Sequence, residues 1–357
     1  MTTDRQARVQ GWTRKEIARL KPYYKAPLAG DPLRLDQNTN LLGNNPALAK
    51  VRLADVDLTQ YPTRDSDALR LALADFHGLP DDRFVCGNGG DELLDILCKA
   101  FGAPGATIAT PWPSYSLYPH VADVAGLKFK PVPTKRQFAQ LDVDGLLDAK
   151  PRIVVVATPN NPTGTRFATG ELERLAAGLD GILVVDEAYI EYAGLKHSFL
   201  PRIEEFDNVV VLRTFSKAYG LAGLRVGYLA ANEALANMLN RAKAPFNVGL
   251  LAEAVAAAAL DEQVWVDAGV KIVRVERDRM AHGLTKLGLK VHASEANFLL
   301  TEPPAGASET QDALRKRGIL ARTFTDAALQ RCLRFTVGAP QHTDRLLAAL
   351  KDAEATA

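Results

Sequence analysis

The sequence predicts an α/β fold with a mostly parallel central sheet, and three observations support this. Short apolar runs rich in β-branched residues recur at 153–157, 182–185, 209–212 and 224–229. Segments with helical periodicity separate these runs, which is typical of strand–helix–strand units. The chain has 357 residues, of which 47% are hydrophobic, so it is long enough to bury a full core.

The composition argues against several classes of protein. The 43 Lys and Arg residues balance 42 Asp and Glu residues, so no strong field attracts nucleic acid or an anionic membrane. The polar N-terminus and the lack of any run of about 18 apolar residues predict a cytoplasmic protein without a membrane span. The three cysteines are isolated, which fits a reducing compartment, and the spacing of the six histidines suggests no metal site.

The chain divides into three regions. The first 35 residues contain three prolines, and we expect them to form an N-terminal arm, extended and packed on another surface. Residues 36–245 carry the alternation of strands and helices and are expected to form the large domain. Longer helical patterns follow and lead to a strand at 333–337, so we expect residues 246–357 to form a smaller α+β domain.

The clearest predicted helix spans residues 91–101. Its leucines share one face, and two acidic residues lie in its first turn, where the helix dipole favours them. The preceding segment 87–90, Gly-Asn-Gly-Gly, lacks the GxGxxG order of dinucleotide-binding sites. The start of this helix is instead a candidate phosphate site. The backbone N–H groups available there belong to Gly89, Gly90 and Asp91.

Polar residues follow the predicted strands at their carboxyl ends, where open α/β sheets bind their ligands. These segments are 158–164 (Thr-Pro-Asn-Asn-Pro-Thr-Gly), 186–189 (Asp-Glu-Ala-Tyr) and 214–217 (Thr-Phe-Ser-Lys), and Arg225 opens the last strand. Taken singly, each has an ordinary explanation as a turn, a cap or a solvated side chain. Together they suit one cofactor, the phosphorylated pyridine aldehyde pyridoxal 5'-phosphate.

Each group of this cofactor has a candidate partner. Lys217 can supply the amine for a Schiff base, and Asp186 can keep the ring nitrogen protonated as an electron sink. Asn161 and Tyr189 can donate to the ring oxygen, and Tyr115 can cover the ring face. The phosphate would be bound by the helix start together with Thr214, Ser216 and Arg225.

These motifs resemble the signature of the fold type I, class I/II pyridoxal-phosphate aminotransferases. The most specific segment is 213–227, Arg-Thr-Phe-Ser-Lys-Ala-Tyr-Gly-Leu-Ala-Gly-Leu-Arg-Val-Gly. Within that family the chain is most similar to the histidinol-phosphate aminotransferases, from about residue 20 onward. The segments that carry this closer similarity are 61–62, 87–92, 244–247, 318–322 and 333–338.

The resemblance implies an aspartate-aminotransferase-like fold and a homodimer with shared active sites. In such a dimer, Tyr61 of one chain would reach the cofactor phosphate bound by the other. The resemblance also implies that Lys217 is the Schiff-base lysine and proton shuttle, and that Asp186 lies at the ring nitrogen. The substrates would be a small-molecule amino donor and a keto-acid acceptor.

For the amino donor, the resemblance implies histidinol phosphate, with 2-oxoglutarate as acceptor, in histidine biosynthesis. A doubly charged phosphate ester favours two guanidinium groups over one, and the family uses the positions of Arg322 and Arg334 for it. Tyr23 matches an arm tyrosine that closes over the substrate, and Asn40 lines the substrate side.

Segment 38–43, Asn-Thr-Asn-Leu-Leu-Gly, departs from the Asn-Glu-Asn-Pro-x-Gly usual in the family. Because this segment lines the substrate side, the amino donor stays open. An aromatic amino acid aminotransferase and a lyase like threonine-phosphate decarboxylase are the alternatives. A non-catalytic regulator that retains the fold is a third hypothesis, and it would bind the cofactor without turning over any amine.

Overall fold

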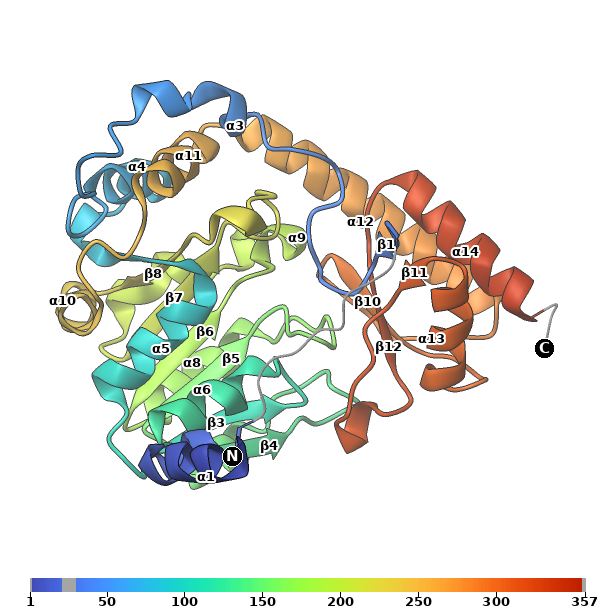
Figure 1. Cartoon of the computed structure of the whole chain (residues 1–357), viewed down its shortest axis with the longest axis horizontal. Coiled ribbons are helices and arrows are strands. Elements are labelled where there is room, and N and C mark those ends of the chain that lie inside the picture. Colours follow the sequence, from blue (N-terminus) through green and yellow to red (C-terminus); the bar gives the residue numbers. More distant parts are fainter. Residues whose placement is uncertain (1, 21–29, 355–357) are drawn as a thin grey trace.

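The structure, a computed structural model, describes residues 2–20 and 30–354. A seven-stranded sheet of order β2-β8-β7-β6-β5-β3-β4 forms the centre of the larger lobe (Figure 1). All neighbouring strands run parallel except β8, which is antiparallel to both β2 and β7. The strands are β2 (Phe84–Gly87), β3 (Thr107–Trp112), β4 (Lys128–Pro133), β5 (Ile153–Ala157), β6 (Ile182–Asp186), β7 (Val209–Thr214) and β8 (Gly227–Ala231).

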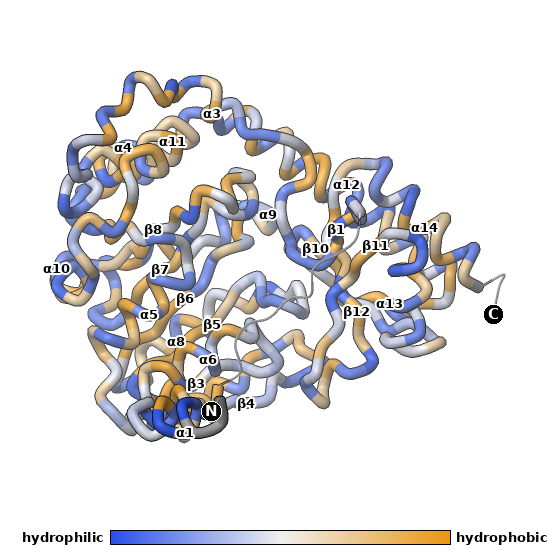
Figure 2. The backbone as a smooth tube through the Cα atoms, viewed as in Figure 1, coloured by the Kyte–Doolittle hydropathy of each residue, from blue (hydrophilic) through white to orange (hydrophobic). Residues whose placement is uncertain are grey.

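Helices cover both faces of this sheet. Alternate residues of β5 show this, since Ile153 and Val155 lie in one buried hydrophobic cluster while Val154 and Val156 lie in another. Figure 2 shows hydrophobic residues concentrated along the central strands. The larger lobe's helices include α4 (Asp67–His77), α5 (Gly89–Phe101), α6 (Leu117–Ala125), α7 (Val143–Asp148), α8 (Thr169–Gly178), α9 (Ile190–Ala193), α10 (Glu233–Ala242) and α11 (Leu250–Leu260).

The smaller lobe is built on a three-stranded antiparallel sheet of order β12-β10-β9. The 24-residue helix α12 (Gln263–Lys286) leads into it from the larger lobe (Figure 1). The other elements here are β9 (Lys290–Val291), β10 (Phe298–Glu302), α13 (Ala307–Lys316), β11 (Ile319–Leu320), β12 (Leu333–Thr336) and α14 (Pro340–Glu354). Strand β1 (Leu33–Arg34), far away in sequence, pairs in parallel with β11.

The four apolar runs predicted as strands are confirmed, with shifts of one to three residues in some boundaries. The last strand begins at Gly227 instead of 224, because residues Ala222–Leu224 form a 3-10 turn and Arg225 adopts a left-handed conformation with φ 55°. Strands β3 and β4 were not predicted. Both contain proline, and β4 is an edge strand with exposed lysines, so neither has the pattern of a central strand.

The prediction of an extended N-terminal arm is wrong for residues 2–20. This segment forms helices α1 (Thr2–Trp12) and α2 (Lys15–Ala18), and Arg19 pairs with Asp123 of α6 in the same chain. All three prolines that suggested an extended arm come after residue 20, so they do not prevent these helices. Among the helices within the described ranges, none has the length and apolar character needed to cross a membrane.

Candidate active site

The carboxyl edge of the large sheet gathers the polar segments that follow its strands. Asp186 ends β6, and Thr214 ends β7. Because β8 is antiparallel, its first residue, Gly227, pairs with Thr214 and brings the preceding Arg225 to the same edge. Gly87 at the end of β2 also pairs with Gly227, so helix α5 starts beside them. Sheet topology therefore brings together residues that are far apart in sequence.

Asp186 is a buried carboxylate held by two donors. The hydroxyl of Tyr118 donates to Oδ2 at 2.6 Å, and the backbone N–H of Ala188 donates to Oδ1 at 3.0 Å. Burial raises the pKa of Asp186, whereas the two donated hydrogen bonds act in the opposite direction. A cationic ring nitrogen beside this carboxylate would offset its desolvation.

Lys217 lies among the residues expected to surround the cofactor. Its Nζ donates to the backbone oxygen of Gln37 at 3.3 Å and lies 5.7 Å from the centre of the Tyr189 ring. The Tyr189 ring is buried and packs edge-on against Phe298 at 5.1 Å. Its hydroxyl accepts a hydrogen bond from Asn38 Nδ2 at 3.1 Å. A primary amine and a phenol therefore lie on the same side of the site.

The start of α5 has the shape of an anion cradle. Gly89 has φ 81°, a left-handed conformation that favours glycine, and a Cβ added there would lie 2.5 Å from Nη2 of the Arg225 side chain. The side chain of the N-cap residue Asn88 does not cap α5, and Glu92 Oε2 accepts from the backbone N–H of Asn88 at 2.5 Å. In the described part of the chain the N–H groups of Gly89, Gly90 and Asp91 meet no side chain, which leaves them available to an anion. Arg225 pairs with Asp91 at 3.2 Å. Beside them, Thr214 Oγ1 donates to Ser216 Oγ at 3.0 Å.

Two arginines lie side by side at the edge of the smaller lobe's sheet. Arg322 and Arg334 exchange backbone N–H···O hydrogen bonds of 3.0 Å in both directions, which places their side chains on the same face. Arg334 is 7% exposed, and burial lowers its pKa to about 10, with the charge of Arg322 acting in the same direction. Such a pair of like charges suits a ligand that carries two negative charges.

Arg334 also connects the smaller lobe to the larger one. Its Nη1 donates to Asn161 Oδ1, and its Nη2 donates to the backbone oxygen of Asp36 at 2.8 Å. Asn161 is buried in the segment after β5. Within the part of the chain that the structure describes, no acceptor lies within hydrogen-bonding distance of its Nδ2. That amide donor is accessible to a ligand.

The other predicted site residues have varied surroundings. Tyr115 contacts Asp91 through its hydroxyl at 3.4 Å. Tyr61 is 81% exposed and stacks on Phe246, with 5.1 Å between ring centres. Both ends of the Asn40 amide are engaged within the chain, through Ala218 and Leu42. Tyr23 lies outside the described residues.

Comparison with known proteins identifies the family. Residues 30–350 match the family described as aminotransferase class I and II. The histidinol-phosphate aminotransferase of Roseiflexus castenholzii is 38% identical over 97% of this chain and 99% of its own length. This chain belongs to the class I and II aminotransferase family.

Solved structures of aminotransferases share the fold. The histidinol-phosphate aminotransferase of Sinorhizobium meliloti, solved in complex with pyridoxal-5'-phosphate, is 28% identical with a TM-score of 0.87, over 97% of this chain and 98% of that one. A tetra mutant of aspartate aminotransferase from Thermus thermophilus, 20% identical, has a TM-score of 0.79 over 96% of this chain and 99% of that one. The predicted aspartate-aminotransferase-like fold is confirmed.

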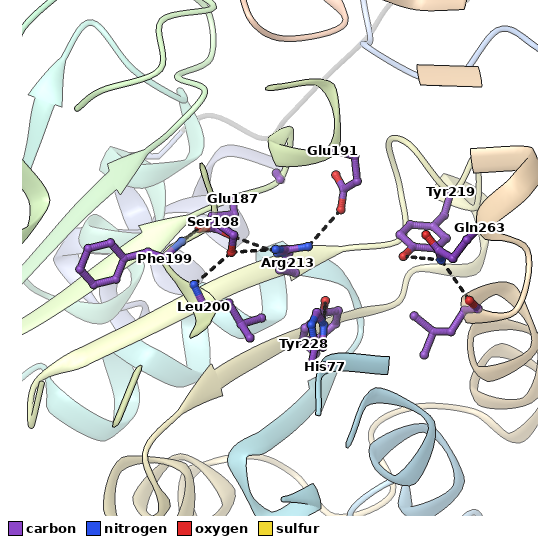
Figure 3. A network of polar contacts seen from close by, with 12 residues as sticks. His77, Glu187, Glu191, Ser198, Phe199, Leu200, Arg213, Tyr219, Tyr228 and Gln263 are labelled. Carbon is purple, nitrogen blue, oxygen red and sulfur yellow. Dashed lines mark hydrogen bonds and ion pairs between the residues drawn. The ribbon is translucent and has the colours of Figure 1, made fainter. Parts of the chain in front are cut away.

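In this aminotransferase a buried ion network anchors the strand ends that carry the site (Figure 3). Arg213 donates to Glu187 at 2.9 Å and lies 3.4 Å from Glu191, and all three side chains are almost fully buried. Glu187 directly follows Asp186, and Arg213 directly precedes Thr214. The ion pair therefore ties together the neighbouring ends of β6 and β7. Burial raises the pKa of Glu191 to about 7, and the charge of Arg213 opposes that shift.

His77 lies within the influence of the Arg213 charge and makes the stability of the enzyme depend on pH. Its Nε2 lies 2.8 Å from the Tyr228 hydroxyl (Figure 3). Burial, reinforced by the charge of Arg213, lowers the pKa of His77 to about 3. Below pH ~6.5 the unfolded chain therefore binds a proton that the folded chain excludes, so stability falls as the pH falls towards 3.

Between pH 7 and pH 5 we expect His77 to contribute a loss of about 2 kcal/mol in the free energy of unfolding. Urea unfolding at the two pH values measures this loss, and His77→Gln should remove it. His120→Gln, at an exposed position, is the matched control. Equal pH dependence in the wild type and His77→Gln would contradict the assignment.

Two residues that contact the site were missed by sequence reasoning. Tyr118, which donates to Asp186, lies three residues after Tyr115 and could have been found from that spacing at the start of a helix. Asn38 had only one signal, its place in a segment that departs from the pattern usual in the family. No local pattern predicts its contact with Tyr189, because 151 residues separate the two.

Away from this site, the structure brings three potential metal ligands together. Ligand atoms of His292, Glu302 and Cys332 lie within 4.8 Å of one another. The ammonium of Lys290 lies 2.6 Å from the same Glu302 oxygen that contacts His292 at 2.8 Å. The charge of Glu302 is thus already balanced by a cation of the protein.

Proposed function

We propose that this aminotransferase transfers the amino group of histidinol phosphate to 2-oxoglutarate, giving imidazole-acetol phosphate and glutamate. The observation that carries the proposal is the side-by-side placement of Arg322 and Arg334. A phosphate ester has three oxygens and two charges for two guanidinium groups, whereas a carboxylate needs only one. The similarity to histidinol-phosphate aminotransferases of known sequence supports the same substrate, and histidine biosynthesis as the pathway.

The proposed cofactor is pyridoxal 5'-phosphate, and the residues present fit it. When bound, it supplies an electron sink that makes the α-proton of the amino substrate acidic. Lys217 would hold its aldehyde carbon, Asp186 its ring nitrogen, and Tyr115 its ring face. Asn161 and Tyr189 would donate to its ring oxygen. The left-handed Gly89 at the start of α5 and the accessible Nδ2 of Asn161 support this fit. The residues for the phosphate would be Gly89, Gly90, Asp91, Thr214, Ser216 and Arg225.

The protein groups have distinct tasks in the proposed reaction. Lys217, once the amino substrate replaces its amine, is free to act as the base that moves the α-proton. Asp186 keeps a positive charge on the ring nitrogen as negative charge develops on the substrate carbon. Arg334 binds the substrate anion with Arg322 and also contacts Asn161, so substrate and cofactor contacts are linked. The keto product of the donor leaves before the acceptor enters, while the amino group stays on the enzyme, so we expect ping-pong kinetics.

The amino donor can be tested with single half-reactions. The visible absorbance of the cofactor-loaded enzyme is followed while histidinol phosphate, phenylalanine or threonine phosphate is added without any keto acid. We expect histidinol phosphate to bleach the band at the lowest concentration. Preference for phenylalanine would indicate an aromatic aminotransferase. Release of carbon dioxide from threonine phosphate would indicate a lyase, and cofactor binding without reaction of any amine would indicate a regulator.

The phosphate assignment of the arginine pair predicts a selective defect. We expect Arg322→Gln to raise the KM for histidinol phosphate about 10- to 100-fold, because hydrogen bonds between charged groups contribute about 1.5–3 kcal/mol. Steady-state kinetics measure this change, and the cofactor band should stay as in the wild type. Arg315→Gln, on the exposed face of α13, is the matched control. An unchanged KM in Arg322→Gln would contradict the phosphate assignment.

We also propose that the enzyme is a homodimer in which Tyr61 completes the partner's phosphate site. Tyr61 and Phe246 form an exposed aromatic pair, and Leu53 and Leu58 nearby in sequence are also mostly exposed. Exposed apolar side chains grouped in this way are typical of an interface. The start of α5, in the same chain, offers the rest of the phosphate cradle.

Mixing two defective variants tests the shared site. Lys217→Ala and Tyr61→Ala should each have low activity alone. A mixed dimer has one site with both native residues, so activity should recover to roughly a quarter of the wild type after subunit exchange, as expected for statistical mixing. Sedimentation as a monomer, or no recovery in a verified mixed dimer, would contradict the shared site.

A further inference from the structure

Three successive residues near the N-terminus each contact a different predicted site residue. The contacts are Arg334 Nη2 to the oxygen of Asp36 at 2.8 Å, Lys217 Nζ to the oxygen of Gln37 at 3.3 Å, and Asn38 Nδ2 to the Tyr189 hydroxyl at 3.1 Å. The first two use backbone oxygens, which any residue type supplies. Only the third depends on the identity of the side chain, so Asn38 is the position where the sequence matters.

Asn38 is held rigidly by the smaller lobe. It is 1% exposed and adopts a left-handed backbone conformation with φ 54°, which asparagine tolerates better than most residues. Its backbone N–H donates to Thr336 Oγ1 at 2.9 Å, and its backbone oxygen accepts from Asn297 Nδ2 at 3.1 Å. These backbone contacts fix the position and backbone geometry of Asn38 independently of the contact between its side chain and Tyr189.

Thr336 also determines which way the Asn38 amide faces. Its hydroxyl oxygen accepts from the backbone of Asn38, so its single proton is available to Asn38 Oδ1, at 3.3 Å. With Oδ1 facing Thr336, the NH₂ end faces Tyr189. The Tyr189 oxygen then accepts a hydrogen bond from Asn38, and the proton of the phenol is left to be donated elsewhere.

We propose that Asn38 is a positioning residue that turns the Tyr189 hydroxyl so that its proton is donated into the cofactor site. This inference rests on the proposed function, in which Tyr189 donates to the ring oxygen of pyridoxal phosphate. Asn38 acts only through Tyr189 and touches no reacting atom. Asn38 is hydrogen-bonded to Thr336 of β12. The smaller lobe therefore controls the direction in which Tyr189, a residue of the larger lobe, donates its hydrogen bond.

The substitution Asn38→Asp tests the direction of this hydrogen bond. Aspartate has nearly the same shape and tolerates the same backbone conformation, but an ionised carboxylate only accepts. It would take the phenol proton and turn it away from the cofactor. Asn38→Ala removes the donor without adding a charge and serves as a second variant. Asn45→Asp is the matched control, because Asn45 is also 1% exposed and donates to the backbone oxygen of Tyr219, at 2.9 Å.

The readout is the pH titration of the visible band of the cofactor-loaded protein, together with the dissociation constant of pyridoxal phosphate. A hydrogen bond donated to the ring oxygen lowers the proton affinity of the adjacent Schiff-base nitrogen, so its loss raises the titration midpoint. We expect Asn38→Asp and Tyr189→Phe each to raise that midpoint by about one pH unit and to weaken cofactor binding about tenfold. Asn38→Ala should shift it in the same direction, and Asn45→Asp should leave it unchanged.

The double variant Asn38→Asp/Tyr189→Phe decides whether Asn38 acts through Tyr189. If it does, the double variant titrates like Tyr189→Phe alone. The inference would be overturned if Asn38→Asp raised the midpoint by the same amount in the Tyr189→Phe background as in the wild type. It would also be overturned if Asn38→Asp alone titrated like the wild type. Either result would leave the proposed function intact. A wild-type protein that binds no pyridoxal phosphate would overturn both.

Discussion

Replacing Lys217 by alanine should reduce amino transfer by at least about 10²- to 10⁴-fold, the range over which a positioned acid or base accelerates proton transfer. The loss has two physical causes in the proposed reaction. The variant cannot hold the cofactor through a covalent bond, and it lacks the amine that moves the α-proton. Among the described residues, Lys217 has the only lysine Nζ placed near the Tyr189 ring.

The measurement compares product formation from histidinol phosphate and 2-oxoglutarate in the wild type and the variant. The visible band of the Schiff base should be absent from Lys217→Ala. Lys196→Ala, an exposed lysine outside the site, is the matched control and should retain full activity. Thermal unfolding of the cofactor-free proteins shows whether the substitution leaves the fold intact. A Lys217→Ala enzyme with near-normal turnover would refute its assignment as the Schiff-base lysine.

Replacing Asp186 by alanine should cost far more activity than replacing Tyr189 by phenylalanine. A carboxylate beside a cation shifts its pKa by about 1–3 units, and each unit corresponds to 1.36 kcal/mol, so Asp186→Ala should lower kcat/KM about 10- to 1000-fold. Tyr189→Phe removes only one of the two proposed donors to the ring oxygen and leaves Asn161 in place, so its effect should be about tenfold or less.

Steady-state kinetics with both substrates measure the two losses, and Asp186→Asn separates the charge from the shape of the side chain. The amide oxygen can still accept from the backbone N–H of Ala188, and the NH₂ group can donate to the Tyr118 hydroxyl in place of the hydrogen bond that the carboxylate accepts there. If the charge is what matters, Asp186→Asn should be nearly as slow as Asp186→Ala. Comparable losses in Asp186→Ala and Tyr189→Phe would contradict the charge argument.

Local sequence patterns were sufficient for the parts of this protein that depend on neighbouring residues. The central strands β5, β6 and β7 are continuous apolar runs, as expected of strands buried on both faces, and were predicted close to their observed bounds. Helix α5 was predicted from its apolar face and its acidic first turn. The edge strand β4 was not, because proline and lysine obscure its pattern.

The candidate site was predicted one residue at a time, without the contacts between its members. Lys217, Asp186 and Arg225 each follow or precede a strand, so the convergence of strand ends at one edge of a sheet was enough to propose them together. The contact between Arg334 and Asn161 spans 173 residues. It depends on how the smaller lobe packs against the larger one, which no local pattern encodes.

By itself, the sequence determined the fold class, the order of the central strands along the chain and the residue types that can bind a phosphorylated pyridine aldehyde. These follow from the periodicity of apolar residues and from side-chain chemistry, which are properties of single segments. Only the tertiary structure decided that Arg322 and Arg334 share a face, that Tyr118 holds Asp186, and that Asn38 faces Tyr189. Hydrogen bonds act over about 3 Å, and distant segments come that close only after the whole chain has packed.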